Sequence, residues 1–146
     1  MTALLLVGLL LASEAAAVPP PVPLSFREFF EPSPRELRPS ARLLSLAGKR
    51  VKLVGFMAEM ESPPTGGFYL CAAPVTATEA GGGTADLPPD AVFVVVKSAA
   101  GKPLQHIARP LEVTGVLELG PVTHEDGRVS SLRVLLDGPA PSSTTP

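Results

Sequence analysis

The sequence has few cysteines, aromatic residues and charges, and each shortage excludes a class of protein. Its 146 residues include one cysteine, one tyrosine and no tryptophan, and 18% of them are charged. A single cysteine excludes an intramolecular disulfide and any paired-cysteine metal site. A net charge of −2 provides no general attraction to nucleic acid or to an anionic membrane surface. What the chain has instead is 18 prolines and 13 glycines, which divide it into short segments.

The N-terminus carries an apolar run, Ala3–Ala12, which is too short to span a bilayer. Small residues follow it up to Ala17, as at a signal-peptidase cleavage site. We therefore predict a signal peptide over residues 1–17 and export of the mature chain to the periplasm or the medium, with no transmembrane segment. A buried N-terminal helix is the alternative, although Val18–Pro23 would end it abruptly.

Residues 18–39 are predicted to form a proline-rich linker and a short helix. Val18–Pro23 is dense in proline and is expected to be extended. Ser25 and Glu28 have the spacing of a capping box, which starts a helix. Pro32 is expected to end this helix after about two turns.

A β domain is predicted over residues 40–138, before a disordered tail at 139–146. It begins with a second short helix, Ala41–Ala47, which Ser40 caps and Gly48 ends. Five segments then have the alternation, or the continuous apolar run, of β-strands. They are Arg50–Met60, Phe68–Ala72, Ala91–Lys97, Pro110–Leu119 and Val129–Leu136.

Two of these strands carry a glycine at the same place in a similar pattern. Val51–Met57 has it at Gly55, and Leu111–Leu117 has it at Gly115. A glycine within a strand is typical of a bulge or a sharp bend, which lets one strand serve two sides of a small barrel.

The strands together predict a mainly β fold, a small five-stranded OB-fold-like Greek-key barrel with one or two short N-terminal helices. The connection between the third and fourth strands, residues 98–109, has room for the helical turn that this fold often carries. A β-sandwich or a rolled sheet without full closure is the alternative.

The segment Leu43–Met57, with Phe68–Leu70 and Val92–Val95 at the next strands, resembles an uncharacterised family of bacterial exported proteins. This family is a domain of unknown function with an OB-like barrel. The resemblance covers residues 40–137 and implies the barrel and export, but it supplies no activity. Family members often carry cysteines after the second strand, whereas Ala73–Asp90 has none.

A possible binding face consists of Tyr69 and Phe93 on predicted strands, with His124, Glu125 and Asp126 in the loop between the last two strands. In an OB-fold this loop flanks the usual ligand face. The opposing interpretation is a solvated turn that is built on the Asp-Gly dipeptide in this loop.

Five residues offer sulfur or imidazole ligands for copper or zinc. They are Met57, Met60, Cys71, His106 and His124. Met57 and Met60 are three positions apart, so on a regular strand they face opposite sides. Packing in the core is the other interpretation for Met57 and Cys71.

No catalytic motif accompanies these residues. The sequence has no nucleophile elbow, no His-Glu-x-x-His and no phosphate-binding glycine loop. Cys71 would act as a nucleophile only beside a base or a positive group, and its sequence neighbours offer none. Lys49, Arg50 and Lys52 form a small basic cluster that is typical of an exposed strand edge, so we predict no nucleic-acid binding.

These observations favour an exported, non-catalytic binding or interaction module, and not an enzyme. Its expected partner is an envelope protein or a small ligand. Periplasmic handling of copper or zinc is the alternative function, and an enzyme that depends on the Cys71 thiol is a third.

Overall fold

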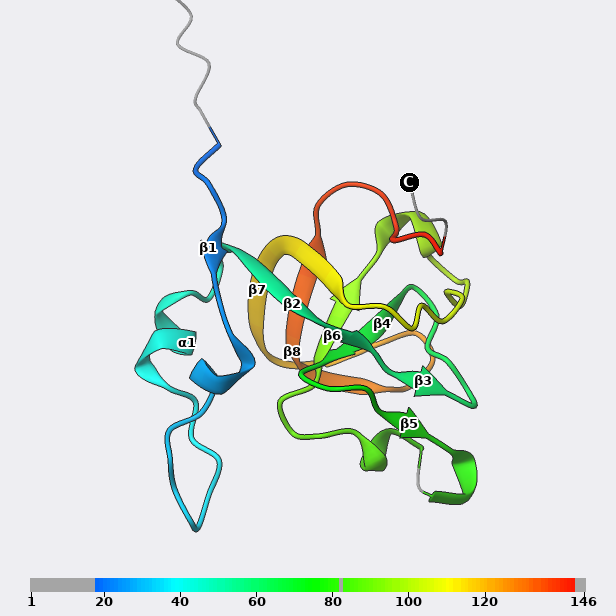
Figure 1. Cartoon of the computed structure of the whole chain (residues 1–146), viewed down its shortest axis with the longest axis horizontal. Helices are drawn as coiled ribbons and strands as arrows, with labels where there is room; N and C mark the ends of the chain where they lie inside the picture. The colour runs from blue at the N-terminus through cyan, green and yellow to red at the C-terminus, as the bar shows by residue number, and fades with distance from the viewer. Residues whose placement is uncertain (1–17, 82, 144–146) are drawn as a thin grey trace, which may run out of the picture.

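The computed structural model describes residues 18–81 and 83–143, so the predicted signal peptide lies outside it. The described part is mainly β, with a mixed six-stranded sheet, a two-stranded sheet and one short α-helix (Figure 1). The strands are β1 Val22–Pro23, β2 Arg50–Met57, β3 Glu59–Met60, β4 Gly67–Cys71, β5 Thr76–Ala77, β6 Val92–Val95, β7 Leu111–Thr123 and β8 Val129–Leu136. The helix α1 spans Ala41–Ser45, and short 3₁₀ turns span Phe26–Glu28, Glu79–Gly81, Gly83–Asp86 and Lys97–Ala99.

The six-stranded sheet has the order β1-β2-β4-β6-β8-β7, and β7 also pairs with β2. Residues 50–55 of β2 pair with β7, whereas Phe56 and Met57 pair with β4. Within this sheet β1 runs parallel to β2 and β6 runs parallel to β8, and the other pairs are antiparallel. The pairings of β2, β4, β6, β8 and β7 therefore lead from strand to strand and return to β2 (Figure 1).

All five predicted strands are present, some with different bounds. β7 continues past its predicted end, Leu119, to Thr123. The strand predicted over Arg50–Met60 divides into β2 and β3, because the backbone changes partner after Ala58. The N–H of Ala58 donates to the carbonyl of Tyr69 on β4, but the next N–H donates to the segment before β5.

The segment Ala73–Asp90, between the second and third predicted strands, contains β5, a strand that the sequence did not indicate. β5 pairs in parallel with β3, with Thr76 opposite Glu59 and Ala77 opposite Met60. A strand of two residues is too short for alternation to mark it in the sequence.

Both ends of the described chain contact the β domain. The proline-dense segment is extended, but its last residues, Val22–Pro23, form β1 beside β2 instead of acting only as a linker. In the described part of the C-terminal tail, Ala140 packs against the main core. The carbonyl of Ser142 accepts a hydrogen bond of 2.9 Å from Arg109.

The two predicted helices are both shorter than expected. The capping box at Ser25 is present, but it begins a single 3₁₀ turn and not a two-turn helix. The carbonyl of Phe29 accepts from the N–H of Ser40, so it is not free to extend that turn. α1 ends at Ser45, although Ser40 caps it as predicted. None of the described helices has the length and apolar composition needed to span a membrane.

Of the bulge or bend predicted at Gly55 and Gly115, neither position carries a bulge, because strand pairing continues through both. Each lies against a neighbouring backbone carbonyl instead. A Cβ would be 2.5 Å from the Cys71 carbonyl oxygen at Gly55 and 2.0 Å from the Leu135 carbonyl oxygen at Gly115. Gly55 is also the point where β2 passes from β7 to β4, so one strand serves two partners. The register shift of β7 lies further along, after Leu119.

One face of the sheet holds the main core, and a smaller cluster lies on the other face. β6 is buried on both faces, since Val92 and Val94 join the main core while Phe93 joins the smaller cluster. The largest fully buried side chains of the main core are Phe29, Leu43, Leu53, Leu70 and Leu117. Removal of this apolar surface from water stabilises the fold.

Gly55→Ala is expected to destabilise the protein by about 1–3 kcal/mol, because the new methyl group meets a backbone carbonyl that cannot rotate away. Urea denaturation would measure the change. Gly101→Asn is the matched control, since nothing lies within 4 Å of its Cβ position and asparagine tolerates its φ of 72°. A cost at Gly55 no larger than at Gly101 would contradict the close approach.

Candidate functional site

The smaller cluster lies on the outer face of β4 and β6. Tyr69, Cys71 and Phe93 belong to it, because they alternate along their strands with residues that enter the main core. Side chains from β3, from the segment before β5 and from the segment before β6 cover this face. The covering residues are Met60, Val75, Leu87 and Ala91.

Three rings of the expected binding face contact one another. The ring centroids of Tyr69 and Phe93 are 5.1 Å apart, and those of Phe93 and His124 are 4.5 Å apart. The structure therefore brings together residues that are far apart in the sequence. Tyr69 and Phe93 are only 6% and 2% exposed, however, so they are not open stacking platforms.

The other two expected residues lie in the turn that follows His124. Asp126 pairs with Arg128 at 3.5 Å and also accepts from its backbone N–H at 3.1 Å. The Asp-Gly dipeptide makes the turn, as its sequence predicts, with Gly127 at a φ of 84°. Glu125 lines a hollow beside Phe93. The turn is therefore held by its own hydrogen bonds and also borders this hollow.

Arg128 holds this turn against another loop. Its Nη2 donates to the carbonyl of Ser62 at 2.6 Å, and its Nη1 lies 4.0 Å from the sulfur of Met60. The loop after β7 therefore contacts the loop after β3, at one end of the outer face.

A buried arginine, which the sequence analysis missed, supports the ring of His124. Arg133 Nη1 donates to the carbonyls of Gly120 and Ser130, both at 2.7 Å, and its Nε lies 3.3 Å from Glu118. It also donates to the Ser130 hydroxyl at 3.3 Å. The same hydroxyl forms a hydrogen bond of 2.6 Å with His124 Nε2. The sequence signal for Arg133 was that it is the one charged residue in β8, which is otherwise apolar and serine-rich.

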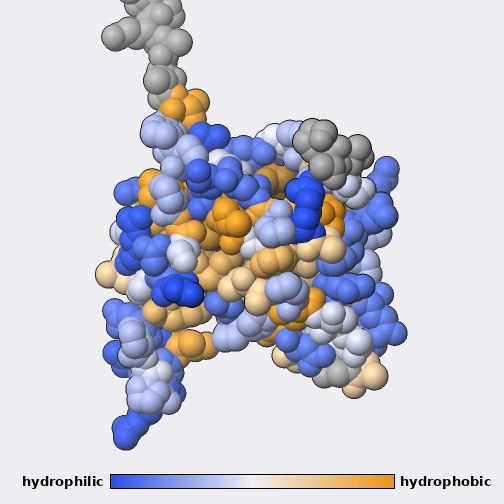
Figure 2. All heavy atoms as spheres, viewed as in Figure 1, coloured by the Kyte–Doolittle hydropathy of each residue, from blue (hydrophilic) through white to orange (hydrophobic). Residues whose placement is uncertain are grey.

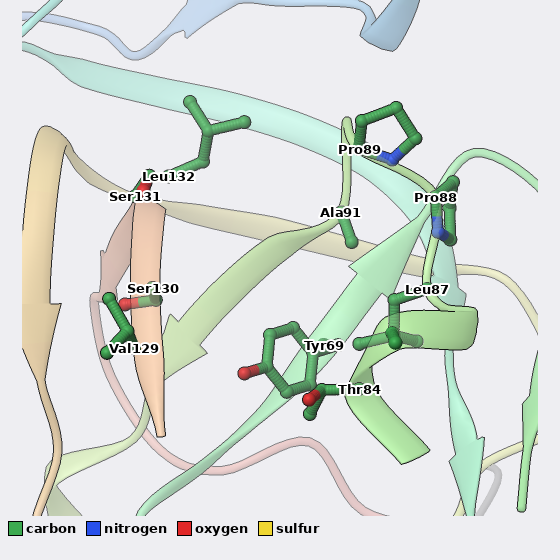
Figure 3. A pocket seen from close by; sticks show the side chains of 11 residues that line it. Tyr69, Thr84, Leu87, Pro88, Pro89, Ala91, Val129, Ser130, Ser131 and Leu132 are labelled. Carbon is green, nitrogen blue, oxygen red and sulfur yellow. The ribbon is translucent and has the colours of Figure 1, made fainter. Parts of the chain in front are cut away.

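Two hollows border this group of residues. The larger, about 360 Å³, lies between Tyr69, parts of residues 84–91 and residues 129–132 of β8 (Figure 3). The other, about 310 Å³, is lined by Phe93 and His124 among others. Both volumes are in the range of small binding pockets.

Apolar side chains reach the surface both within these hollows and outside them. Figure 2 shows them gathered across the centre of one face, between hydrophilic edges. Two valines are almost equally exposed, Val129 at 59% and Val54 at 57%. Val129 lines the larger hollow, whereas Val54 lies on β2 and does not line it.

The five candidate metal ligands do not meet at one place. Met57 lies in the main core, with its carbonyl 3.1 Å from His106 Nε2. Met60 and Cys71 belong to the outer cluster, so the two methionines face opposite sides, as their spacing predicted. His124 is held by its hydrogen bond in the ring group. Within residues 18–81 and 83–143, no group of three or more histidine, cysteine or acidic side chains is arranged to hold a metal ion.

The Cys71 thiol is fully buried and poorly suited to nucleophilic chemistry. Burial raises its pKa to about 11, and the nearby Asp90 carboxylate adds to this effect. At neutral pH only about one molecule in ten thousand would carry the reactive thiolate. A catalytic cysteine needs the opposite environment, in which a positive group lowers the pKa.

The buried thiol makes the stability of the protein depend on alkaline pH. An unfolded chain ionises Cys71 near pH 9.0, whereas the folded chain keeps it neutral up to about pH 11. The contribution of Cys71 to the free energy of unfolding is therefore fully present below pH 9. It falls by about 2–3 kcal/mol as the pH rises towards 11. Denaturation at a series of pH values should show this slope, with a smaller slope in Cys71→Ala. Equal slopes would contradict the burial of the thiol.

Arg133→Ala is expected to lower the free energy of unfolding by about 2–4 kcal/mol, because the buried carbonyl of Ser130 and the part-buried carbonyl of Gly120 lose their donor. Arg38→Ala is the control, since Arg38 also pairs with a glutamate but its side chain is 66% exposed. The control should cost less than about 1 kcal/mol. Similar losses in the two variants would argue against a structural role for the buried guanidinium.

Comparison with known proteins gives a match in structure but none in sequence. No family model matches the chain, and no curated protein matches it in sequence. The fold is similar to the crystal structure of a DUF3299 family protein (PA4066) from Pseudomonas aeruginosa PAO1, at 14% identity and a TM-score of 0.47. The match covers 82% of this chain and 95% of that chain. That protein, like the family that the sequence resembles, is named for a domain of unknown function, and the match carries no conclusion about activity or ligand.

Proposed function

We propose that this chain is an exported, non-catalytic binding module with an OB-fold-like barrel, and that it binds its partner on the outer face of β4 and β6. The observation that carries the proposal is the group of Tyr69, Phe93 and His124 between two open hollows. These hollows combine concave surface with converging aromatic and polar groups.

The strand pairing supports the OB-like barrel. The five longest strands in chain order are β2, β4, β6, β7 and β8, and the fifth lies between the third and the fourth in the sheet. The third and fifth run parallel, and the first pairs with both the second and the fourth. This crossing order is that of a Greek-key barrel of the OB type.

The position of the loops supports the choice of face. OB-folds bind ligands on the face of their second and third strands, between the loop after strand one and the loop after strand four. In this chain that face carries Tyr69 and Phe93, and those loops are residues 58–66 and 124–128. The contact of Arg128 with Ser62 joins the two loops at the end of the face.

Export and the absence of catalysis are parts of the same proposal. The apolar run Ala3–Ala12, followed by small residues, supports export. The buried, neutral Cys71 supports a non-catalytic function, since it is the strongest nucleophile of the chain. The scattered positions of the methionines, Cys71 and the histidines give no support to metal handling as the main function.

Site-specific photocrosslinking in the cells that produce the protein tests the proposal. A photoreactive amino acid replaces Val129 beside the larger hollow in one variant and Val54 on β2 in the other. The two positions are matched in residue type and exposure. We expect an adduct of defined mass in the envelope fraction from position 129 and none from position 54.

An adduct of equal yield from position 54 would contradict the chosen face. The absence of any adduct at position 129, in a variant with an unchanged melting temperature, would contradict the binding function.

A further inference from the structure

The first half of β8 has a strand on one side only. β6 pairs with residues 133–135 of β8, whereas among the strands that the structure describes residues 129–132 have only β7 beside them. The chain before β6 lies across from this free edge, with Leu87 and Ala91 in the opposite wall of the larger hollow (Figure 3). The hollow therefore lies where a further strand would pair with β8.

The lining of this hollow carries no charge. It is made of eleven residues, none of which is acidic, basic or histidine. Four of them carry hydroxyl groups, and the rest are alanine, valine, leucine and proline. The hydroxyl-bearing residues are Tyr69, Thr84, Ser130 and Ser131. A charged ligand would lose its hydration here without gaining an opposite charge, so the lining selects a neutral one.

Tyr69 is the best-placed polar group of the hollow. Its side chain projects into the space from β4 (Figure 3), although the residue is only 6% exposed. Its hydroxyl makes no hydrogen bond to any described residue. Burial raises the pKa of Tyr69, so the hydroxyl remains a donor at all physiological pH values. The hydroxyl still reaches solvent, because no buried side-chain nitrogen or oxygen of the described residues lacks a partner. An acceptor on a ligand would therefore replace water at this donor.

From these observations we propose that the larger hollow binds an extended, uncharged peptide segment of a partner protein. The segment lies along residues 129–132 of β8, and one of its carbonyls accepts from the Tyr69 hydroxyl. This inference rests on the proposed function and adds the chemical class of the ligand.

A peptide matches the hollow better than the other neutral ligands do. Its backbone supplies alternating N–H and C=O groups, which an open strand edge binds by strand addition. Its alternating side chains place every second residue towards the apolar lining formed by Leu87, Pro88 and Leu132. A compact small molecule would leave the strand edge unused, and a nucleic acid would need positive charge that the lining lacks.

A selection from a random library of displayed heptapeptides, with the full chain as bait, tests the inference. Tyr69→Phe and Val129→Glu serve as parallel baits, and Val54→Glu is the matched control for the second variant. Tyr69→Phe should fold as well as the parent, because the hydroxyl that it loses makes no hydrogen bond to the protein. We expect enriched peptides to be uncharged, and Val129→Glu to lose them while Val54→Glu retains them.

Titration with one enriched peptide, followed by NMR, gives the second measurement. The largest shifts should fall on residues 129–132 and 87–91 and on Tyr69. Tyr69→Phe should weaken binding about threefold to tenfold, which is the loss of one hydrogen bond. Methylation of alternate peptide nitrogens should weaken it about tenfold or more, because strand addition needs those N–H groups.

Charged winners, equal binding by Tyr69→Phe, or no enrichment above the Val129→Glu level would each overturn the inference. The photocrosslink at position 129 separates this failure from that of the proposed function. A crosslink without peptide enrichment would mean that the face binds a ligand of another class. The absence of both would remove the binding function as well.

Discussion

The structure depends on one strand that pairs with two others. β2 passes from β7 to β4 at Gly55, where the Cys71 carbonyl leaves no room for a side chain. This close approach lets the pairings of five strands return to their start, so that one face of the sheet holds the main core. The other face is left outside, and its residues must find cover elsewhere. The proposed binding surface is therefore a consequence of the same strand pairing that forms the core.

The outer face of β4 and β6 is only partly covered, so its surface contains hollows. β3 and the segments before β5 and β6 bury Cys71 and most of Tyr69, but they leave hollows on the surface. The Ser130 hydroxyl bonds to both Arg133 and His124, and the bond from Arg128 to the Ser62 carbonyl holds the neighbouring turn. These polar contacts support the surface, and a surface that is already ordered loses less entropy when it binds.

Much of the fold could be predicted from the sequence, because alternation and glycine placement are local signals. The five main strands and the cap at Ser40 follow from them. β1 and β5 could not be predicted, since each has two residues and exists only through a distant partner. For the site, Tyr69, Phe93 and the turn after His124 were found as aromatic and turn residues. Arg133 was missed, because its burial depends on carbonyls of another strand.

Hydrogen exchange on the amides of β8, measured with and without the photocrosslinked partner, tests the central claim most directly. The account predicts that the partner slows exchange at residues 129–132 and 87–91, where the free strand edge borders the larger hollow, and leaves β2 unchanged. Protection confined to β2 and α1, with unchanged exchange along β8, would contradict it.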